Sequence, residues 1–178
     1  MSIISTNRLQ LRELNENDAE FIFRLLNQES WKKYIGDKQI DSIAAAIAYI
    51  NNGPRTMYQN YGFGLWAVDE VALNCPIGIC GLIKRDNLPA VDLGFAFLDE
   101  YTGRGYAYEA CTGVINYAKN ALAEKELLAI ALPENLRSIK LLNKLGFVVE
   151  NQHFKVSAAD HTLNLLRLQI SGKQLPSG

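Results

Sequence analysis

The sequence is poor in the residues that disulfide-rich and metal-binding proteins require. Its 178 residues include two histidines and three cysteines. The odd number of cysteines, each in an apolar stretch, favours reduced thiols of a cytoplasmic protein over a disulfide framework. Because neither histidine lies near a Cys-x-x-Cys pair, the four grouped ligands of a zinc site are missing. We therefore expect a cytoplasmic protein without a metal.

Excess charge and long apolar runs are also missing. The chain carries 18 basic and 19 acidic residues, for a formal net charge of -1. It therefore lacks the basic footprint of a nucleic-acid-binding protein. No apolar run approaches the roughly 18 residues that a membrane span needs, and the start of the chain does not resemble a secretory signal. We expect neither a nucleic-acid partner nor a membrane association.

The composition that remains is that of a globular protein. Hydrophobic residues make up 48% of the chain and charged residues 21%, which is enough to build a real core. We predict a single domain over residues 1–170. The last eight residues, SGKQLPSG, predict a disordered tail over 171–178.

The first half of the chain predicts a strand, two helices and then three strands. Residues 57–61 read as a loop or a short helical turn, and Asn-Asn-Gly-Pro ends the helix before it. The three later strands predict an antiparallel meander. The ranges are strand 9–14, helices 15–26 and 43–50, and strands 62–68, 76–85 and 91–98.

The second half predicts two helices, a buried strand and a closing hairpin. The first helix starts at Gly105, and its apolar residues recur every three or four positions. The second lies within residues 133–147, with Asn135 as N-cap and Gly146 just past its end. The buried strand covers 127–132, and the hairpin pairs 147–154 with 162–170 around a turn at 157–160.

The segment EYTGRGYAYEA, residues 100–110, joins the last meander strand to a helix through two glycines. The unpaired N–H groups and the positive dipole end of a helix start form a site for an anion such as phosphate. A tight turn that binds nothing is the alternative. A dinucleotide motif would need glycine or alanine at Tyr108, and a P-loop would need Lys-Ser/Thr after Gly105, so neither is predicted.

The order of motifs resembles the GNAT acetyltransferases, and within them the RimJ and RimL type, which acetylates ribosomal proteins. TNRLQLREL, TGRGYAYEA, PENLRSIKLLNKLGF and the closing strand carry this resemblance over nearly the whole chain. It implies an α/β fold with a mixed, mostly antiparallel, splayed central sheet of about seven strands, flanked by about four helices.

The resemblance also implies acetyl-CoA as cosubstrate. The family motif Gln/Arg-x-x-Gly-x-Gly/Ala matches residues 102–107, with Thr102 in place of Gln or Arg. Backbone amides of this segment would cradle the pyrophosphate. Arg104 would add charge or would be a solvated turn residue. The implied cofactor-binding residues of this turn are Gly103, Arg104, Gly105, Tyr106 and Ala107.

Further roles follow from the same resemblance. Backbone near Phe97 and Leu98 would bind the pantetheine arm and the oxyanion, and Asn135 would contact that arm. The general acid is commonly a tyrosine at the position held here by Leu142, so Ser138 becomes the candidate acid. The alternative is that Asn135 and Ser138 are ordinary helix-start residues without a role in the reaction.

Asp92 is the candidate base, since it lies near the start of the strand at 91–98 and could hold a water that takes the amine proton. A solvated strand-end carboxylate is the alternative. Near pH 7.5 an α-amine is roughly one third neutral, whereas a lysine amine is about 0.1% neutral. The lack of an obvious strong base therefore favours α-amino acceptors.

The leading hypothesis is an N-acetyltransferase that acts on protein N-termini by direct attack in a ternary complex, as a monomer or homodimer. Polyamines, amino acids and aminoglycosides are alternative acceptors. A non-catalytic sensor that binds coenzyme A is the competing class, favoured by Thr102 and Leu142. Aromatic residues that would line an acceptor groove or pack in the core are Trp31, Tyr34, Tyr58 and Tyr61.

Overall fold

The computed structural model describes residues 1–156 and 161–170. The turn expected at 157–160 and the tail expected at 171–178 lie outside the described residues. In the first half of the chain the elements are β1 (Ser2–Ser5), β2 (Leu9–Arg12), the 3-10 helix η1 (Glu16–Asp18), α1 (Ala19–Leu26), α2 (Glu29–Tyr34), α3 (Ile43–Asn52), α4 (Pro54–Tyr61), β3 (Leu65–Glu70) and β4 (Cys75–Ile83). In the second half they are β5 (Asp92–Phe97), η2 (Asp99–Tyr101), α5 (Tyr106–Asn120), β6 (Glu126–Ala131), α6 (Leu136–Lys144), β7 (Val148–Phe154) and β8 (Leu163–Gln169).

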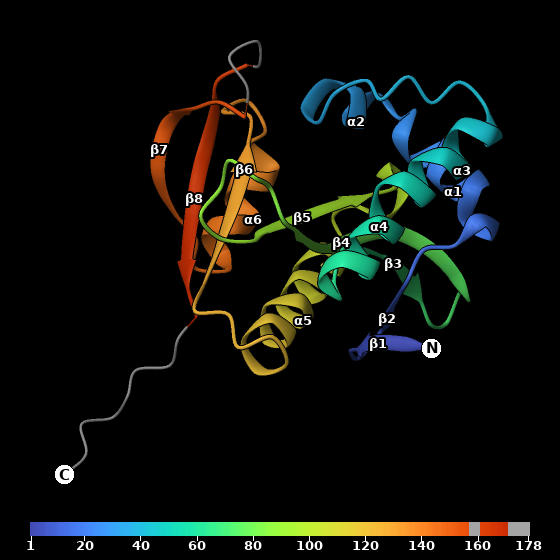
Figure 1. The fold of residues 1–178 in the computed structure, drawn as a ribbon, viewed down its shortest axis with the longest axis horizontal. Coiled ribbons are helices and arrows are strands. Elements are labelled where there is room, and N and C mark those ends of the chain that lie inside the picture. The colour runs from blue at the N-terminus through green and yellow to red at the C-terminus, as the bar shows by residue number, and fades with distance from the viewer. Residues whose placement is uncertain (157–160, 171–178) are drawn as a thin grey trace.

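The described strands form one mixed sheet in the order β1-β2-β3-β4-β5-β6-β8-β7. Neighbouring strands are antiparallel except β5 and β6, which run parallel. A helical crossover is required between parallel neighbours, and α5 supplies it. Figure 1 shows α1 to α4 gathered beside one half of the sheet, while β6, β7 and β8 form the other end of the sheet, next to α6. The expected mixed, mostly antiparallel α/β sheet is therefore confirmed.

The two faces of the sheet bury different helices. On one face α5 packs through Ala110, Cys111 and Val114 against strand residues that include Trp66 and Leu82. The other face packs against α1, α2 and α3, whose buried residues include Ile22, Leu25, Trp31 and Ile50. Each fully buried aliphatic side chain contributes about 1.5–3 kcal/mol relative to an exposed one. Strand β5 contributes residues to both layers, whereas β6 packs in the layer of α5 through Leu127, Ala129 and Ala131.

Three elements depart from the sequence expectations. Strand β1 adds to the seven expected, and its four residues are too few for a clear alternation. Helix α2 buries only Trp31 among polar neighbours, so it has no apolar stripe that periodicity would reveal. Residues 57–61, expected as a loop or short helical turn, belong to the helix α4, which Pro54 starts and Gly62 ends with a φ of 75°.

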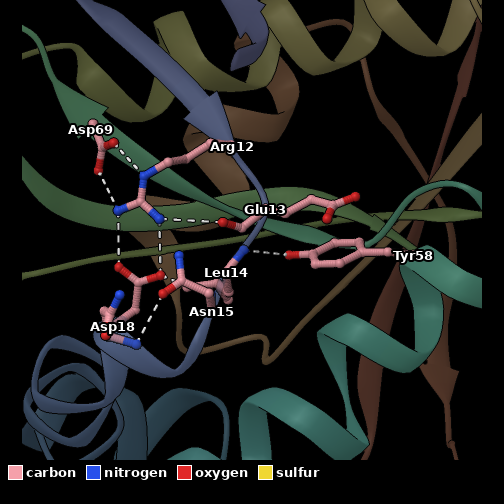
Figure 2. Close-up of polar contacts among 8 residues, drawn as sticks. Arg12, Glu13, Leu14, Asn15, Asp18, Tyr58 and Asp69 are labelled. Carbon is pink, nitrogen blue, oxygen red and sulfur yellow. Dashed lines mark hydrogen bonds and ion pairs between the residues drawn. The ribbon is translucent and has the colours of Figure 1, made fainter. Parts of the chain in front are cut away.

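A polar network fastens the start of the chain to the sheet. Arg12 of β2 donates to both carboxylate oxygens of Asp18 at 2.9 Å, and its Nε donates to Asp69 of β3 at 2.6 Å. Nearby, the hydroxyl of Tyr58 accepts from the Leu14 N–H at 3.2 Å (Figure 2). The carboxylates raise the pKa of the Arg12 guanidinium above its usual range, against the effect of burial. Strand β2 therefore ends in a fixed position.

Candidate active site

The sheet opens between β5 and β6. Their registered pairing is limited to Asp92 opposite Leu128, where the Leu128 N–H donates to the Val91 carbonyl at 3.0 Å. Beyond this bridge the two parallel strands diverge. A cleft of about 1030 Å³ is lined by the end of β5, the glycine turn, α2 and the starts of α5 and α6.

The edge of β5 that faces the opening follows from its hydrogen bonds. Successive residues of a strand direct their N–H and C=O groups to alternate edges. Because the Val91 carbonyl bonds to β6 while the Leu98 N–H donates to the carbonyl of Ile77 in β4 at 2.9 Å, odd-numbered residues face β6. Phe95 and Phe97 therefore direct backbone groups into the region where β6 has turned away, and both line the cleft.

The structure separates the two β5 residues proposed for the pantetheine arm. Phe97 lines the cleft, whereas Leu98 is not among the lining residues and its N–H is already bonded to β4. Phe95, two residues before Phe97, is the other β5 residue whose backbone faces the cleft. Sequence reasoning missed Phe95. Knowing one bridge between β5 and β6 would have been enough to find it, because alternate residues of a strand face the same edge.

Gln28, at the start of α2, joins the α2 wall of the cleft to the end of β5. Its Nε2 donates to the Phe97 carbonyl at 3.2 Å and its Oε1 accepts from the Asp99 N–H at 2.8 Å. Ser30 adds a bond from its hydroxyl to Asp99 at 2.8 Å. Trp31 also lines the cleft, and its buried indole N–H has no hydrogen-bond partner within the described residues.

The sequence expectations for the aromatic residues are met in part. Trp31 and Tyr34 both line the cleft on α2. Tyr58 is not a lining residue, because its hydroxyl bonds to the backbone of Leu14 and Leu65. Tyr61 stacks on Phe63 with ring centroids 5.8 Å apart.

The glycine turn has the geometry that an anion site needs. Gly103 and Gly105 have φ of +77° and +81°, a region that residues with a Cβ rarely adopt. A Cβ at Gly103 would meet open space, so the backbone conformation accounts for the glycine there. Gly105 is the N-cap of α5 without a side-chain cap, and the first N–H groups of this helix have no partner four residues earlier.

The other turn residues lie differently. Tyr106 and Ala107 line the cleft. Arg104 is exposed and not among the lining residues, and its guanidinium carbon lies 5.8 Å from the centroid of the Tyr101 ring. Thr102 uses its hydroxyl to bond the Asp99 carbonyl at 2.8 Å. Thr102 therefore serves the local turn.

The start of α6 forms the opposite wall. Asn135 is its N-cap, and the side-chain oxygen of Asn135 accepts from the Ser138 N–H at 3.3 Å. Both residues line the cleft, together with the basic residues Arg137, Lys140 and Lys144 of the same helix. Leu142, at the position of the family tyrosine, is 1% exposed and packs in the core.

Asp92 lies outside the cleft. Its carboxylate is 2% exposed and pairs with the Arg85 Nε at 3.1 Å. Burial raises the pKa of the Asp92 carboxyl from 3.8 to about 6, and the attraction of Arg85 opposes that rise. Asp92 is therefore a buried residue at the bridge between β5 and β6 rather than a solvated strand-end acid.

The described ranges 1–156 and 161–170 contain no group of three or more His, Cys, Asp or Glu residues placed to hold a metal ion. In the same part of the chain, no helix combines the length and the apolar character that crossing a bilayer requires.

Comparison with known proteins identifies the class to which this fold and cleft belong. The model of the acetyltransferase (GNAT) domain matches residues 8–148. The chain belongs to the GNAT acetyltransferase family, and it is an acyltransferase.

Individual relatives agree with the expected RimJ and RimL type. YoaA, an uncharacterised N-acetyltransferase of Bacillus subtilis (strain 168), is 29% identical over 150 residues, which are 83% of this chain and 84% of that protein. The [ribosomal protein uS5]-alanine N-acetyltransferase of Escherichia coli (strain K12) is 32% identical over 90 residues, 49% of this chain and 45% of that protein. The solved structure of RimL, a ribosomal L7/L12 alpha-N-protein acetyltransferase in complex with coenzyme A, has a TM-score of 0.81 at 13% identity, over 96% of this chain and 98% of that chain.

Proposed function

We propose that the protein transfers the acetyl group of acetyl-CoA to the α-amino group of a protein N-terminus. The observation that carries this proposal is the cleft itself, in which the β5 edge that β6 leaves uncovered, the glycine turn and the start of α6 come together. An extended pantetheine arm would lie along the β5 edge at Phe95 and Phe97, as an added strand does. Its pyrophosphate would sit on the amides of residues 103–107.

Charge on the walls supports this placement of the cofactor. Arg137, Lys140 and Lys144 follow a spacing of three and four residues, which puts them on one face of α6. All three line the cleft. Positive charge of this kind attracts a phosphate-bearing ligand. Asn135 lies at the end of this row, where the pantetheine arm would pass.

The proposed chemistry is a direct attack of the amine on the thioester carbonyl. The tetrahedral intermediate needs a donor for its oxyanion, and the outward N–H groups of β5 are that donor. Ser138 would donate a hydrogen bond to the departing thiolate sulfur, which takes up the proton that the attacking amine loses, so that free thiol leaves. We assign no step to Asp92, because the structure places it outside the cleft. Holding the amine and thioester together supplies a further several kcal/mol.

The acceptor class follows from the acids that the cleft contains. Among the described residues, the carboxylates that line the cleft are Asp99 and Glu134; both are exposed, and Asp99 accepts a hydrogen bond from Ser30. Neither is a buried base of the kind that could strip a proton from a lysine amine. An α-amine, already roughly one third neutral near pH 7.5, needs no such base. Polyamines, amino acids and aminoglycosides remain the alternative acceptors.

The competing proposal is a sensor that binds coenzyme A without turnover. The burial of Leu142 in the core supports it, because the family's tyrosine acid has no counterpart there. Release of free thiol with an alanine-headed peptide, but not with an N-terminally blocked lysine peptide, is the expected result. Preference for the blocked peptide would contradict the α-amino proposal, and no release with any amine would favour the sensor.

We place the protein in the cytoplasm, as a monomer or homodimer. The support for the compartment is a pair of buried, unlinked thiols, since the sulfurs of Cys80 and Cys111 lie 3.8 Å apart. Such a pair persists where thiols are kept reduced.

The first test of the cofactor site is a thermal melt with and without acetyl-CoA. Ligand at one hundred times its Kd stabilises a protein by about 2.7 kcal/mol, so the wild type should melt at a higher temperature. The double variant Gly103→Val, Gly105→Val should lose this shift, because valine disfavours the positive φ at both positions. An equal shift in a folded double variant would rule out the turn as the cofactor site.

A further inference from the structure

Glu109, in the first turn of α5, accepts hydrogen bonds from three donors of the segment before β2. It accepts from the Thr6 hydroxyl at 2.6 Å, from the Arg8 N–H at 2.8 Å and from the Arg8 Nε at 2.7 Å. Burial opposes ionisation, but these bonds outweigh it and lower the pKa of the Glu109 carboxyl. The carboxylate therefore locks the Arg8 side chain against the helix.

The rest of the Arg8 guanidinium faces the glycine turn. Its Nη1 donates to the Arg104 carbonyl at 3.0 Å. Its Nη2 lies 3.4 Å from where a Cβ of Gly105 would be. The guanidinium carbon is 4.4 Å from the centroid of the Tyr106 ring. Arg8 thus contacts three consecutive residues of the turn, and it lines a second pocket, shared with Gly105 and Glu109, rather than the cleft.

The bond to the Arg104 carbonyl decides where the next amide points. In a trans peptide the C=O and the following N–H point in opposite directions, and the described residues contain no cis peptide bond. Holding the Arg104 oxygen toward Arg8 therefore turns the Gly105 N–H away from Arg8. Gly105 itself lines the cleft. Glycines on both sides of Arg104 leave this peptide little restraint of its own.

We infer that Arg8, held by Glu109, is a positioning residue that fixes the Gly105 amide toward the cofactor pyrophosphate. The inference rests on the proposed cofactor site. Arg8 has no place in the acetyl transfer itself. It pre-organises a turn that would otherwise lose conformational freedom on binding, and such pre-organisation raises affinity.

Two other roles for Arg8 give different results. Arg8 could contact the 3′-phosphate of the cofactor directly, through its Nη2. It could also act only by neutralising Glu109, whose bare carboxylate would repel a phosphate at the start of α5. The first role needs the 3′-phosphate, and the second needs the charge of Glu109.

The experiment measures the Kd of coenzyme A and of dephospho-coenzyme A by titration calorimetry. The proteins are the wild type, Arg8→Met and the double variant Arg8→Met, Glu109→Gln. Arg55→Met is the matched control, because Arg55 is an exposed arginine on α4 that bonds to Asn51. A stoichiometry near one shows that each protein is folded. If Arg8→Met does not fold, Arg8→Lys takes its place, since one ammonium cannot hold Glu109 and the Arg104 carbonyl in the same geometry.

The expected result is a Kd about tenfold higher, equivalent to about 1.4 kcal/mol, for both ligands in Arg8→Met and in the double variant. Arg55→Met should bind as the wild type does. In amide NMR spectra the Gly105 resonance should move in Arg8→Met before any ligand is added.

Four outcomes would overturn the inference. They are an unchanged Kd in Arg8→Met, a loss confined to coenzyme A, a recovery of affinity in the double variant, and an unmoved Gly105 resonance. A wild type that binds neither ligand would overturn the proposed cofactor site together with the inference, whereas a tight wild type with a tight Arg8→Met variant would remove the inference alone.

Discussion

The buried carboxyl of Asp92 makes stability depend on pH in an unusual direction. Its folded-state pKa of about 6 lies above the ordinary value of 3.8, so folding favours the protonated form. The stabilisation is fully present below pH 3.8 and is lost as the pH rises through 6. The whole shift corresponds to about 3 kcal/mol, of which about 2 kcal/mol falls between about pH 4.5 and about pH 7.5.

Asp92→Asn removes this titration and preserves the size of the side chain. Urea unfolding at several pH values gives the free energy of unfolding of each protein. The wild type should lose about 2 kcal/mol relative to Asp92→Asn between about pH 4.5 and about pH 7.5. Asp86→Asn is the matched control, because Asp86 is an exposed carboxylate on the adjoining loop.

The reasoning depends on burial outweighing the attraction of Arg85. A difference in the free energy of unfolding between wild type and Asp92→Asn that stays constant with pH would refute it. A wild type that gains stability relative to Asp92→Asn as the pH rises would show that the ion pair dominates. The same variant also tests the location of the cofactor site. Because Asp92 lies outside the cleft, Asp92→Asn should bind coenzyme A as tightly as the wild type does.

Two further predictions concern packing. Tyr58→Phe should lower the free energy of unfolding by about 1–3 kcal/mol, because the buried Leu14 N–H loses its partner; urea unfolding measures this, and an unchanged stability would mean that water replaces the hydroxyl. In native protein a thiol reagent should modify Cys75 first, because Cys80 and Cys111 are fully buried and burial raises the pKa of the Cys111 thiol well above its usual value. Equal rates at all three sites would show that the α5 face opens readily.

The glycine turn and the caps of α6 were predictable because each depends on a few consecutive residues. Gly103 and Gly105 adopt the positive φ that their positions before a helix indicate. Asn135 caps α6 as expected, and Gly146, with a φ of +99°, follows the end of that helix. Local backbone conformation and side-chain capping are encoded within one turn of chain.

Residues that act across the fold were not predictable in the same way. Gln28 bonds to groups about seventy positions later in the chain. Arg8 bonds to Glu109, which lies about a hundred positions later. Neither pattern leaves a periodic signal. Asp92 was expected to be solvated or near the amine, because alternation along β5 shows only that it lies opposite an apolar face.

The sequence alone determined most of the elements and the glycine turn, since hydrophobic periodicity and turn residues report local conformation. The order of its motifs carried the family resemblance, which in turn implied the class of the sheet. Tertiary structure decided which edge of β5 opens, because that depends on where β6 departs after a single bridge at Asp92. It also decided that Asp92 is buried beside Arg85 and that Arg8 supports the turn. These contacts join residues distant in sequence, and only the packed layers bring them together.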